Sequence, residues 1–214
     1  MIPIAPEGYP YVLALAVAGV LSWTFGYRPL AAVLGLAALA CLAFFRDPAR
    51  SCDAPENAVV APADGKVLSV GAAPAALAGL GLSQQISIFM SPANVHVNRA
   101  PIAGLVREAS LTPGKKLPAF RDKASELNEH SFVHIEGELG AIAYKQIAGS
   151  LARRVVCDLS AGDRVERGQR VGLIKFGSRV DLFLPATARI RVRPGERTRA
   201  GITVVADLPA GSEQ

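Results

Sequence analysis

The tripeptide Ala148-Gly149-Ser150 is the first place where residue type and order could carry chemistry, because a serine hydroxyl follows a glycine at the end of a β-like run. Glycine has no Cβ, so it leaves its carbonyl open to approach and tolerates unusual backbone dihedrals. A serine hydroxyl is a weak nucleophile unless a base activates it. Gly-Ser is also one of the commonest turn dipeptides, so the pair by itself predicts no more than a turn.

The histidines and cysteines show no pattern that would hold a metal ion or a disulfide framework. Neither an HExxH motif nor a CxxC pair occurs, and the number of cysteines is odd. We therefore expect no metal site and only reduced thiols. By residue type alone, each histidine is best interpreted as a structural or surface residue. The three histidines are His96, His130 and His134, and the three cysteines are Cys41, Cys52 and Cys157.

Two uncharged apolar stretches occupy the N-terminal region, ahead of the part of the chain that contains Gly149 and Ser150. They cover residues 9–27 and 30–45, and Arg28-Pro29 is a natural break between them. A bilayer core needs about 20 helical residues, so the first stretch is just long enough and the second is short. Tyrosines and a tryptophan stand near the ends of the first stretch, as interfacial aromatic residues do. The pattern predicts a helical hairpin that spans the membrane or enters it only shallowly.

A cleaved signal peptide is the main alternative for this region, and a pair of buried core helices is another. A signal peptide begins with basic residues, whereas residues 1–10 contain a glutamate and no lysine or arginine. Arg46 and Arg50 follow the second stretch, so the positive-inside tendency places the rest of the chain on the cytoplasmic side of the cell membrane. We expect a membrane-associating region at 1–47 and a second domain at 48–214.

The second domain has the pattern of short β-strands. Residues 58–71 read as an apolar run, a turn and an apolar run, with Asp64-Gly65 predicting a hairpin turn. The polar interval 112–129 predicts a loop with at most a turn or two of helix. Residues 161–185 place glycines between very short strands, which resembles half of a lipoyl or biotinyl carrier domain. We expect a mainly β fold, an interlocked short-strand sandwich of the barrel-sandwich hybrid type. The swinging-arm lysine motif of such carriers does not occur in the sequence.

Composition and charge narrow the class of protein. Apolar residues make up 50% of the 214 residues and charged residues 19%, which excludes wholesale disorder. The net charge is +5. The charged residues within 1–45 are Glu7 and Arg28, which cancel, so the positive excess belongs to the second domain. A basic domain beside an apolar region favours membrane lipids as partners. No nucleic-acid-binding motif supports a nucleic-acid partner.

Six segments of the chain, in order, resemble phosphatidylserine decarboxylases of the short, self-processing type. Each segment alone would be a weak signal, but together they cover nearly the whole chain. They are FFRDP (44–48), APADGKV (61–67), FMSPANVHVNRAP (89–101), PGKKLPAFRDKASELNEH (113–130), KQIAGSLARRVVC (145–157) and GQRVGLIKFGSRVDLFLP (168–185).

This resemblance implies a proenzyme that cuts itself between Gly149 and Ser150. The products would be a β chain, 1–149, and an α chain, 150–214, which stay together as a heterodimer. Ser150 would become a covalent pyruvoyl group, the electron sink for converting phosphatidylserine to phosphatidylethanolamine and carbon dioxide. No other cofactor and no metal are implied.

The resemblance also assigns residues to roles. His96 occupies the position of a family catalytic histidine, and Asp64 that of the aspartate that orients it, so that Asp64, His96 and Ser150 form the self-cleavage set. Longer relatives have a second histidine three residues later, where this chain has Arg99. They also have Leu-Gly-Ser-Thr at the cleavage site, where this chain has Ala-Gly-Ser-Leu. Either His96 acts both as the base in self-cleavage and as the proton donor in decarboxylation, or the proton donor is another residue.

Substrate contacts are harder to assign. Lys175, Ser178 and Arg179 stand near a glycine turn and are candidate ligands for the phosphate and carboxylate of the substrate. The arginines could equally pair with acidic residues of the same domain.

Two other functions remain as alternatives. One is a membrane-tethered adaptor with a lipoyl-like sandwich, which predicts a long coiled coil between the halves; no heptads occur between residues 112 and 130. The other is a pyruvoyl decarboxylase of a soluble amino acid, which gives no reason for an apolar N-terminal region.

Overall fold

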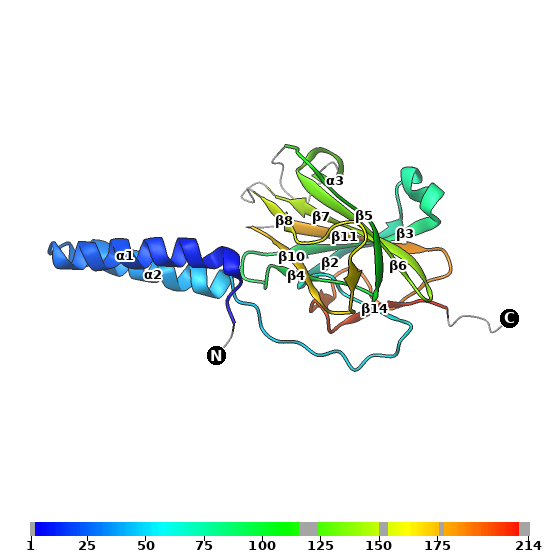
Figure 1. The fold of residues 1–214 in the computed structure, drawn as a ribbon, viewed down its shortest axis with the longest axis horizontal. Helices are drawn as coiled ribbons and strands as arrows, with labels where there is room; N and C mark the ends of the chain where they lie inside the picture. The colour runs from blue at the N-terminus through cyan, green and yellow to red at the C-terminus, as the bar shows by residue number, and fades with distance from the viewer. Residues whose placement is uncertain (1–2, 116–123, 150–153, 176–177, 210–214) are drawn as a thin grey trace. The chain divides into compact units, whose positions relative to one another are not determined.

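The computed structural model describes residues 3–115, 124–149, 154–175 and 178–209 of the protein. The chain divides into two compact units, Met1–Ala49 and Arg50–Gln214. The first unit is helical and the second is built from β-strands (Figure 1). The predicted mainly β fold with an N-terminal helical hairpin is thereby confirmed. Each unit is described by itself.

The first unit is a hairpin of two helices, α1 (Tyr9–Thr24) and α2 (Arg28–Phe44), preceded by the short 3-10 helix η1 (Pro6–Gly8). The turn between α1 and α2 comes just before the predicted break, because Gly26 adopts a φ of 82° there. Proline at position 29 lies in the first turn of α2, where its missing N–H costs no hydrogen bond. The base of the hairpin is tied by the Ala5 N–H, which donates to the Phe45 carbonyl at 2.8 Å.

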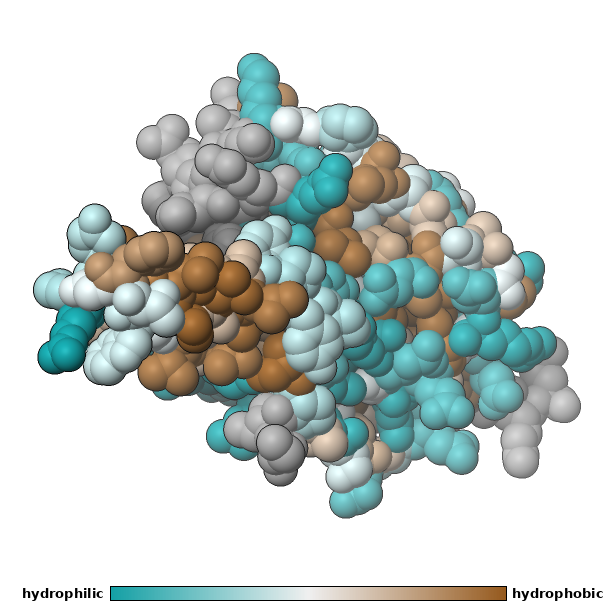
Figure 2. All heavy atoms as spheres, turned by 60° about the vertical axis from the view of Figure 1, so that its left-hand side comes forward, coloured by the Kyte–Doolittle hydropathy of each residue, from teal (hydrophilic) through white to brown (hydrophobic). Residues whose placement is uncertain are grey.

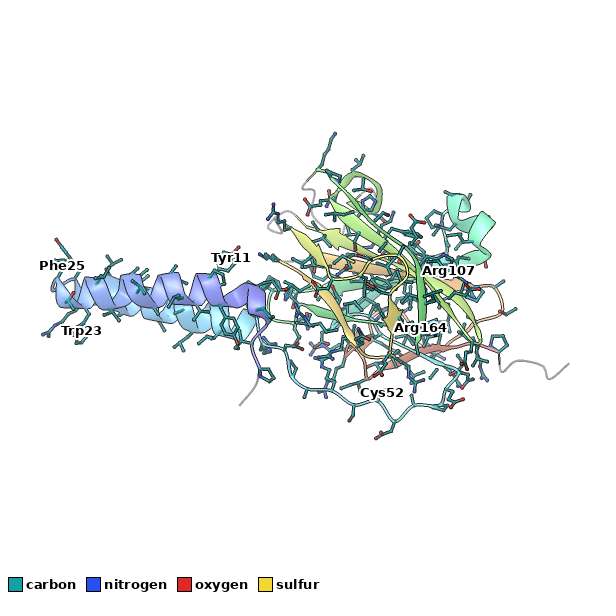
Figure 3. The ribbon with its side chains drawn as sticks, in the orientation of Figure 1. Tyr11, Trp23, Phe25, Cys52, Arg107 and Arg164 are labelled. Carbon is teal, nitrogen blue, oxygen red and sulfur yellow. The ribbon has the colours of Figure 1, made fainter. Side chains whose placement is uncertain are left out.

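Large apolar side chains cover the outside of this hairpin, as Figure 2 shows. Trp23 and Phe25 are 61% and 75% exposed, and they lie at the tip of the hairpin, whereas Tyr11 lies toward its base (Figure 3). An exposed apolar surface of this kind marks a site of contact with a membrane or another apolar partner. Among the described residues, neither helix combines the length and the hydropathy that crossing a bilayer requires.

The second unit contains three antiparallel sheets among its described residues. The largest has eight strands in the order β13-β2-β3-β11-β7-β6-β5-β9 and curls round the core (Figure 1). Two sheets of three strands have the orders β4-β10-β8 and β1-β14-β12. The strands are β1 (Ala58–Val60), β2 (Gly65–Ala72), β3 (Leu82–Met90), β4 (Val97–Arg99), β5 (Gly104–Thr112), β6 (His130–Gly137), β7 (Gly140–Ala148), β8 (Val155–Cys157), β9 (Arg164–Val165), β10 (Arg170–Ile174), β11 (Ser178–Pro185), β12 (Arg189–Ile190), β13 (Arg197–Thr198) and β14 (Val204–Asp207).

Each of the three sheets combines strands from before and after residue 149. Strand β11 lies between β3 and β7, β10 lies between β4 and β8, and β14 pairs with β1. Their side chains share one apolar core, which includes Ile88 of β3, Ile142 of β7 and Leu182 of β11, all with no exposed surface. A cut in the chain near residue 149 would therefore leave two chains that share sheets and a core.

Two connections test the predicted turns. The interval between β5 and β6 contains one described helical turn, α3 (Ala124–Leu127), which agrees with the predicted loop. Asp64-Gly65 does separate two strands, but the predicted hairpin is wrong, because β1 pairs with β14 and β2 pairs with β3. Gly65 serves a close approach instead, since a Cβ there would lie 2.2 Å from the Phe89 carbonyl oxygen. The 3-10 helix η2 (Ala75–Leu80) connects β2 to β3.

Candidate active site

The large sheet brings three strand ends into one row beside the predicted cleavage site. Ser178, the first residue of β11, pairs on one side with Met90, the last residue of β3. On its other side it pairs with Ala148, the last residue of β7. Gly149 follows Ala148 and is buried. The last residues before the predicted cut therefore belong to a fixed, buried strand end.

The β4-β10-β8 sheet brings His96 and the chain after the cut to the same end. The carbonyl of His96 accepts a hydrogen bond from the Ile174 amide at 3.3 Å. Ile174, the last residue of β10, pairs with Val155, the first residue of β8. The chain passes from Ile174 to Ser178 within a few residues, so the row of strand ends in the large sheet lies beside this one. His96, Gly149 and Val155 thus gather at one end of the domain.

The side chain of His96 is buried, with 1% of the residue exposed. Its Nδ1 lies 3.0 Å from the carbonyl oxygen of Asn94, in the turn that joins β3 to β4. A ring nitrogen beside a carbonyl oxygen carries the proton, which leaves Nε2 as the basic nitrogen of the neutral ring. A histidine held in that form can accept a proton at Nε2. The predicted role of His96 as a base is compatible with this geometry.

Asp64 directly precedes β2 and is also buried. It accepts hydrogen bonds from the guanidinium of Arg50 and from the backbone N–H of Ala200, the latter at 2.7 Å. Arg50 also donates to the Ala200 carbonyl at 2.6 Å. Among the hydrogen bonds between described residues, none joins Asp64 to His96. Its assigned role beside His96 stays a prediction.

Ser150, the predicted nucleophile, lies outside the described residues. The backbone on both sides of it is held by two residues that the sequence did not single out, Asn128 and Glu129. The Asn128 amide donates to the Ala148 carbonyl at 2.6 Å, and the Glu129 carboxylate accepts the Val155 N–H at 2.9 Å. Both residues stand in the fourth of the six segments that carried the family resemblance, residues 113–130, but no spacing rule pointed to them.

The predicted substrate ligands lie in the same region but have different surroundings. Ser178 is fully buried, and its hydroxyl donates to the Met90 sulfur at 3.2 Å. The Arg179 guanidinium donates to the Asp181 carboxylate at 2.5 Å and to the Ser87 hydroxyl at 2.9 Å. Lys175 is half-buried, and its backbone N–H donates to the Arg154 carbonyl at 3.2 Å. Their role as substrate ligands stays a prediction, and Arg179 already has a buried carboxylate partner.

A cleft of about 510 Å³ opens beside the residues that follow the predicted cut. Its polar lining residues include Glu129 and Arg154, and its apolar ones include Leu111 and Leu159. Cys157 also lines it, but burial raises the pKa of its thiol, so the unreactive protonated form dominates at neutral pH. No group of metal-ligating side chains occurs among the residues that the structure describes.

Comparison with known proteins assigns the family. The family model for phosphatidylserine decarboxylase matches residues 37–206. A phosphatidylserine decarboxylase proenzyme of Magnetococcus marinus is 46% identical over 210 residues, which are 96% of this chain and 95% of that protein. The proenzyme of Geobacter sulfurreducens is 45% identical over 220 residues, or 97% of each chain. That of Pelodictyon phaeoclathratiforme is 44% identical over 194 residues, or 91% of each. The chain therefore belongs to the phosphatidylserine decarboxylase family and has the enzyme function of that family.

Proposed function

We propose that the protein matures by cutting its own chain between Gly149 and Ser150, and that the matured enzyme converts phosphatidylserine to phosphatidylethanolamine and carbon dioxide. The observation that carries this proposal is the convergence of buried His96, buried Gly149 and the start of β8 at one end of the interleaved sheets. The relatives from Magnetococcus marinus and Geobacter sulfurreducens are described as proenzymes, which supports a processing step.

The self-cleavage balances as an acyl shift followed by an elimination. The Ser150 hydroxyl attacks the Gly149 carbonyl carbon, and the Gly149–Ser150 amide becomes an ester as the nitrogen is protonated. Loss of the Ser150 α-proton then expels the Gly149 carboxylate and leaves a dehydroalanine. Addition of one water releases ammonia and leaves a pyruvoyl group at the start of the α chain. The net change is one water consumed and one ammonia released.

His96 is the proposed base for the first step, because a serine hydroxyl needs one and Nε2 is the basic nitrogen of this ring. Asp64 is the proposed source of negative charge that favours the protonated ring. Its charge is shared with Arg50, so its effect on His96 is electrostatic and weaker than that of a directly bonded carboxylate.

The surroundings fit a covalent ketone at the start of the α chain. Gly149 is buried, and the Val155 N–H of the α chain donates to the Glu129 carboxylate. When present, the pyruvoyl group supplies the electron sink that stabilises the carbanion left by carbon dioxide. His96 is the residue proposed to deliver a proton to that carbon, since this chain has Arg99 where longer relatives have a second histidine.

The substrate and its location follow from the family and from the hairpin. We propose that the exposed apolar surface of α1 and α2 associates with membrane lipids, with the β domain on the cytoplasmic side. Lys175, Ser178 and Arg179 are proposed to contact the phosphate and carboxylate of phosphatidylserine. The interlocked sheets are further proposed to be a lipoyl-type barrel-sandwich. A lipid substrate explains the apolar hairpin, which a soluble amino-acid substrate does not.

The test is the substitution Ser150→Ala, which removes both the nucleophile and the pyruvoyl precursor. We expect the variant to remain one chain and to release no labelled carbon dioxide from phosphatidylserine vesicles. Ser150→Cys should still be cut, since a thiol makes the equivalent acyl shift. Release of carbon dioxide by Ser150→Ala at the wild-type rate would refute the proposal.

A further inference from the structure

We propose that Asn128 and Glu129 are the positioning residues for self-cleavage: together they hold the backbone on both sides of the cleavage segment, which we define as residues 149–154. This inference rests on the proposed self-cleavage. Neither residue supplies a reacting atom. Their contribution is to fix where the Gly149 carbonyl lies and where the chain resumes after Ser150.

The side before the cut is held through the backbone of Ala148. The Asn128 side-chain amide donates to the Ala148 carbonyl at 2.6 Å, and the Ala148 N–H donates to the Glu129 carbonyl at 2.9 Å. Both polar groups of Ala148 are thus bound by one dipeptide, while β11 pairs with the other side of the strand. The next carbonyl along the chain is that of Gly149, which the serine attacks.

The side after the cut is held through the backbone of Val155. The Val155 N–H donates to Oε1 of Glu129 at 2.9 Å, and Val155 pairs with Ile174 in the β4-β10-β8 sheet. The two ends of the cleavage segment are therefore bound to adjacent residues of the chain. We expect this arrangement to limit where the Gly149 carbonyl can lie, and fixing reactants close to the attack geometry accelerates a reaction.

The dipeptide is itself firmly placed, as a positioning device must be. Asn128 has no exposed surface. The Lys115 N–H donates to the Leu127 carbonyl at 2.6 Å, and Nδ1 of His130 lies 2.8 Å from the Asn128 carbonyl oxygen. A Cβ at Gly114 would lie 2.3 Å from the backbone of Asn128, so only glycine permits this close approach.

Glu129 has a second consequence after the cut. It belongs to the β chain, whereas Val155 belongs to the α chain, so the carboxylate to N–H bond becomes a bond between two chains. That bond lies five residues from the new α-chain terminus. It therefore ties the α chain, at Val155, to the β chain after the cut.

The experiment compares Asn128→Asp, Glu129→Ala and Glu129→Gln. Aspartate keeps the size of Asn128 but replaces the donor to Ala148 with an acceptor. Glutamine keeps an oxygen that accepts the Val155 N–H, and alanine does not. We expect Asn128→Asp and Glu129→Ala to slow self-cleavage by about a hundredfold, the effect of a small misplacement, and Glu129→Gln to cut at nearly the wild-type rate. Cell-free synthesis followed by denaturing gels gives the rate at which precursor becomes two chains.

Matched controls separate positioning from general loss of stability. Asn57→Asp removes an amide donor to the Leu208 carbonyl, and Glu196→Ala removes a carboxylate that accepts the Arg193 N–H. Neither bond adjoins the cleavage segment in the chain, so both variants should cut normally. Melting temperatures of every variant, measured on the uncut Ser150→Ala background, report stability alone. Where Asn128→Asp does not fold, Glu129→Ala decides, because it leaves both bonds to Ala148 in place.

Normal cleavage of folded Glu129→Ala, or equal slowing of Glu129→Ala and Glu129→Gln, would overturn the inference. Equal slowing in the Asn57→Asp and Glu196→Ala controls would also overturn it. These outcomes leave the proposed function standing if Ser150→Ala remains uncut. Cutting of Ser150→Ala would instead refute the self-cleavage chemistry itself.

Discussion

The guanidinium of Arg50 binds both oxygens of the Asp64 carboxylate, with Nη1 to Oδ1 at 2.5 Å and Nη2 to Oδ2 at 2.8 Å. Both side chains are nearly buried, at 7% and 12% exposed. Arg50 is the first residue of the β unit, so the assigned catalytic aspartate is held by the residue with which that unit begins. The pair also binds both backbone groups of Ala200. Asp64 is thus a structural anchor as well as a proposed catalytic residue.

Arg50→Ala should strongly destabilise the β domain, because it leaves the Asp64 carboxylate buried without its cation. Breaking a buried pair in this way costs about 3–5 kcal/mol. The control is Arg107→Ala, whose partner is Glu136 in a pair that is about half exposed; its loss should cost less than about 1 kcal/mol. Urea unfolding on the uncut Ser150→Ala background measures both. Equal stability losses in the two variants would contradict this account of the buried pair.

Deletion of residues 1–49 should release the protein from membranes without stopping self-cleavage. The deletion removes the apolar hairpin and keeps Arg50. Deletion of residues 1–50 should impair folding and cleavage, since it also removes the partner of Asp64. Sedimentation with anionic lipid vesicles and denaturing gels check the two outcomes. Complete sedimentation of the 1–49 deletion would show that the basic β domain binds the membrane by itself.

His96→Ala should accumulate the uncut precursor. General-base catalysis contributes about a hundredfold to ten-thousandfold, so slow cutting over hours is compatible with its loss. Protein that does mature should remain nearly inactive, since this chain has Arg99 in place of a second histidine. The rates of chain formation and of carbon dioxide release per cut protein separate the two roles. Cutting at the wild-type rate would move the base to His130 or His134.

Lowering the pH should destabilise the fold through His130. Burial lowers its pKa, with a smaller effect of the same sign from Lys145, while its bond to the Asn128 carbonyl opposes them. A histidine with a folded-state pKa below its ordinary value contributes stability above about pH 6.5, which is lost as the pH falls below that value. His130→Gln should therefore lose less stability than the parent between pH 7.5 and 5.5, as measured by urea unfolding of uncut protein. An identical pH dependence in the two proteins would rule out this role for His130.

The local sequence pattern was enough to predict the helical hairpin and the short β-strands, because apolar runs and glycine turns depend on residues that are close in the sequence. It failed at Asp64-Gly65, since the partners of β1 and β2 are set by tertiary contacts: β14 comes from the far end of the chain. The family resemblance pointed to His96 and Gly149, which the structure brings to one end of the domain. Arg50, Asn128 and Glu129 were missed, because their partners are backbone groups and side chains distant in the sequence.

The mass of the purified wild-type protein under denaturing conditions tests self-cleavage at Gly149–Ser150 most directly. We expect two chains, 1–149 and 150–214. The smaller should be lighter by one ammonia than a simple hydrolysis product and should resist N-terminal sequencing, because a ketone replaces its amine. A single uncut chain of 22.4 kDa in a preparation that decarboxylates phosphatidylserine would show that the active enzyme does not depend on self-cleavage.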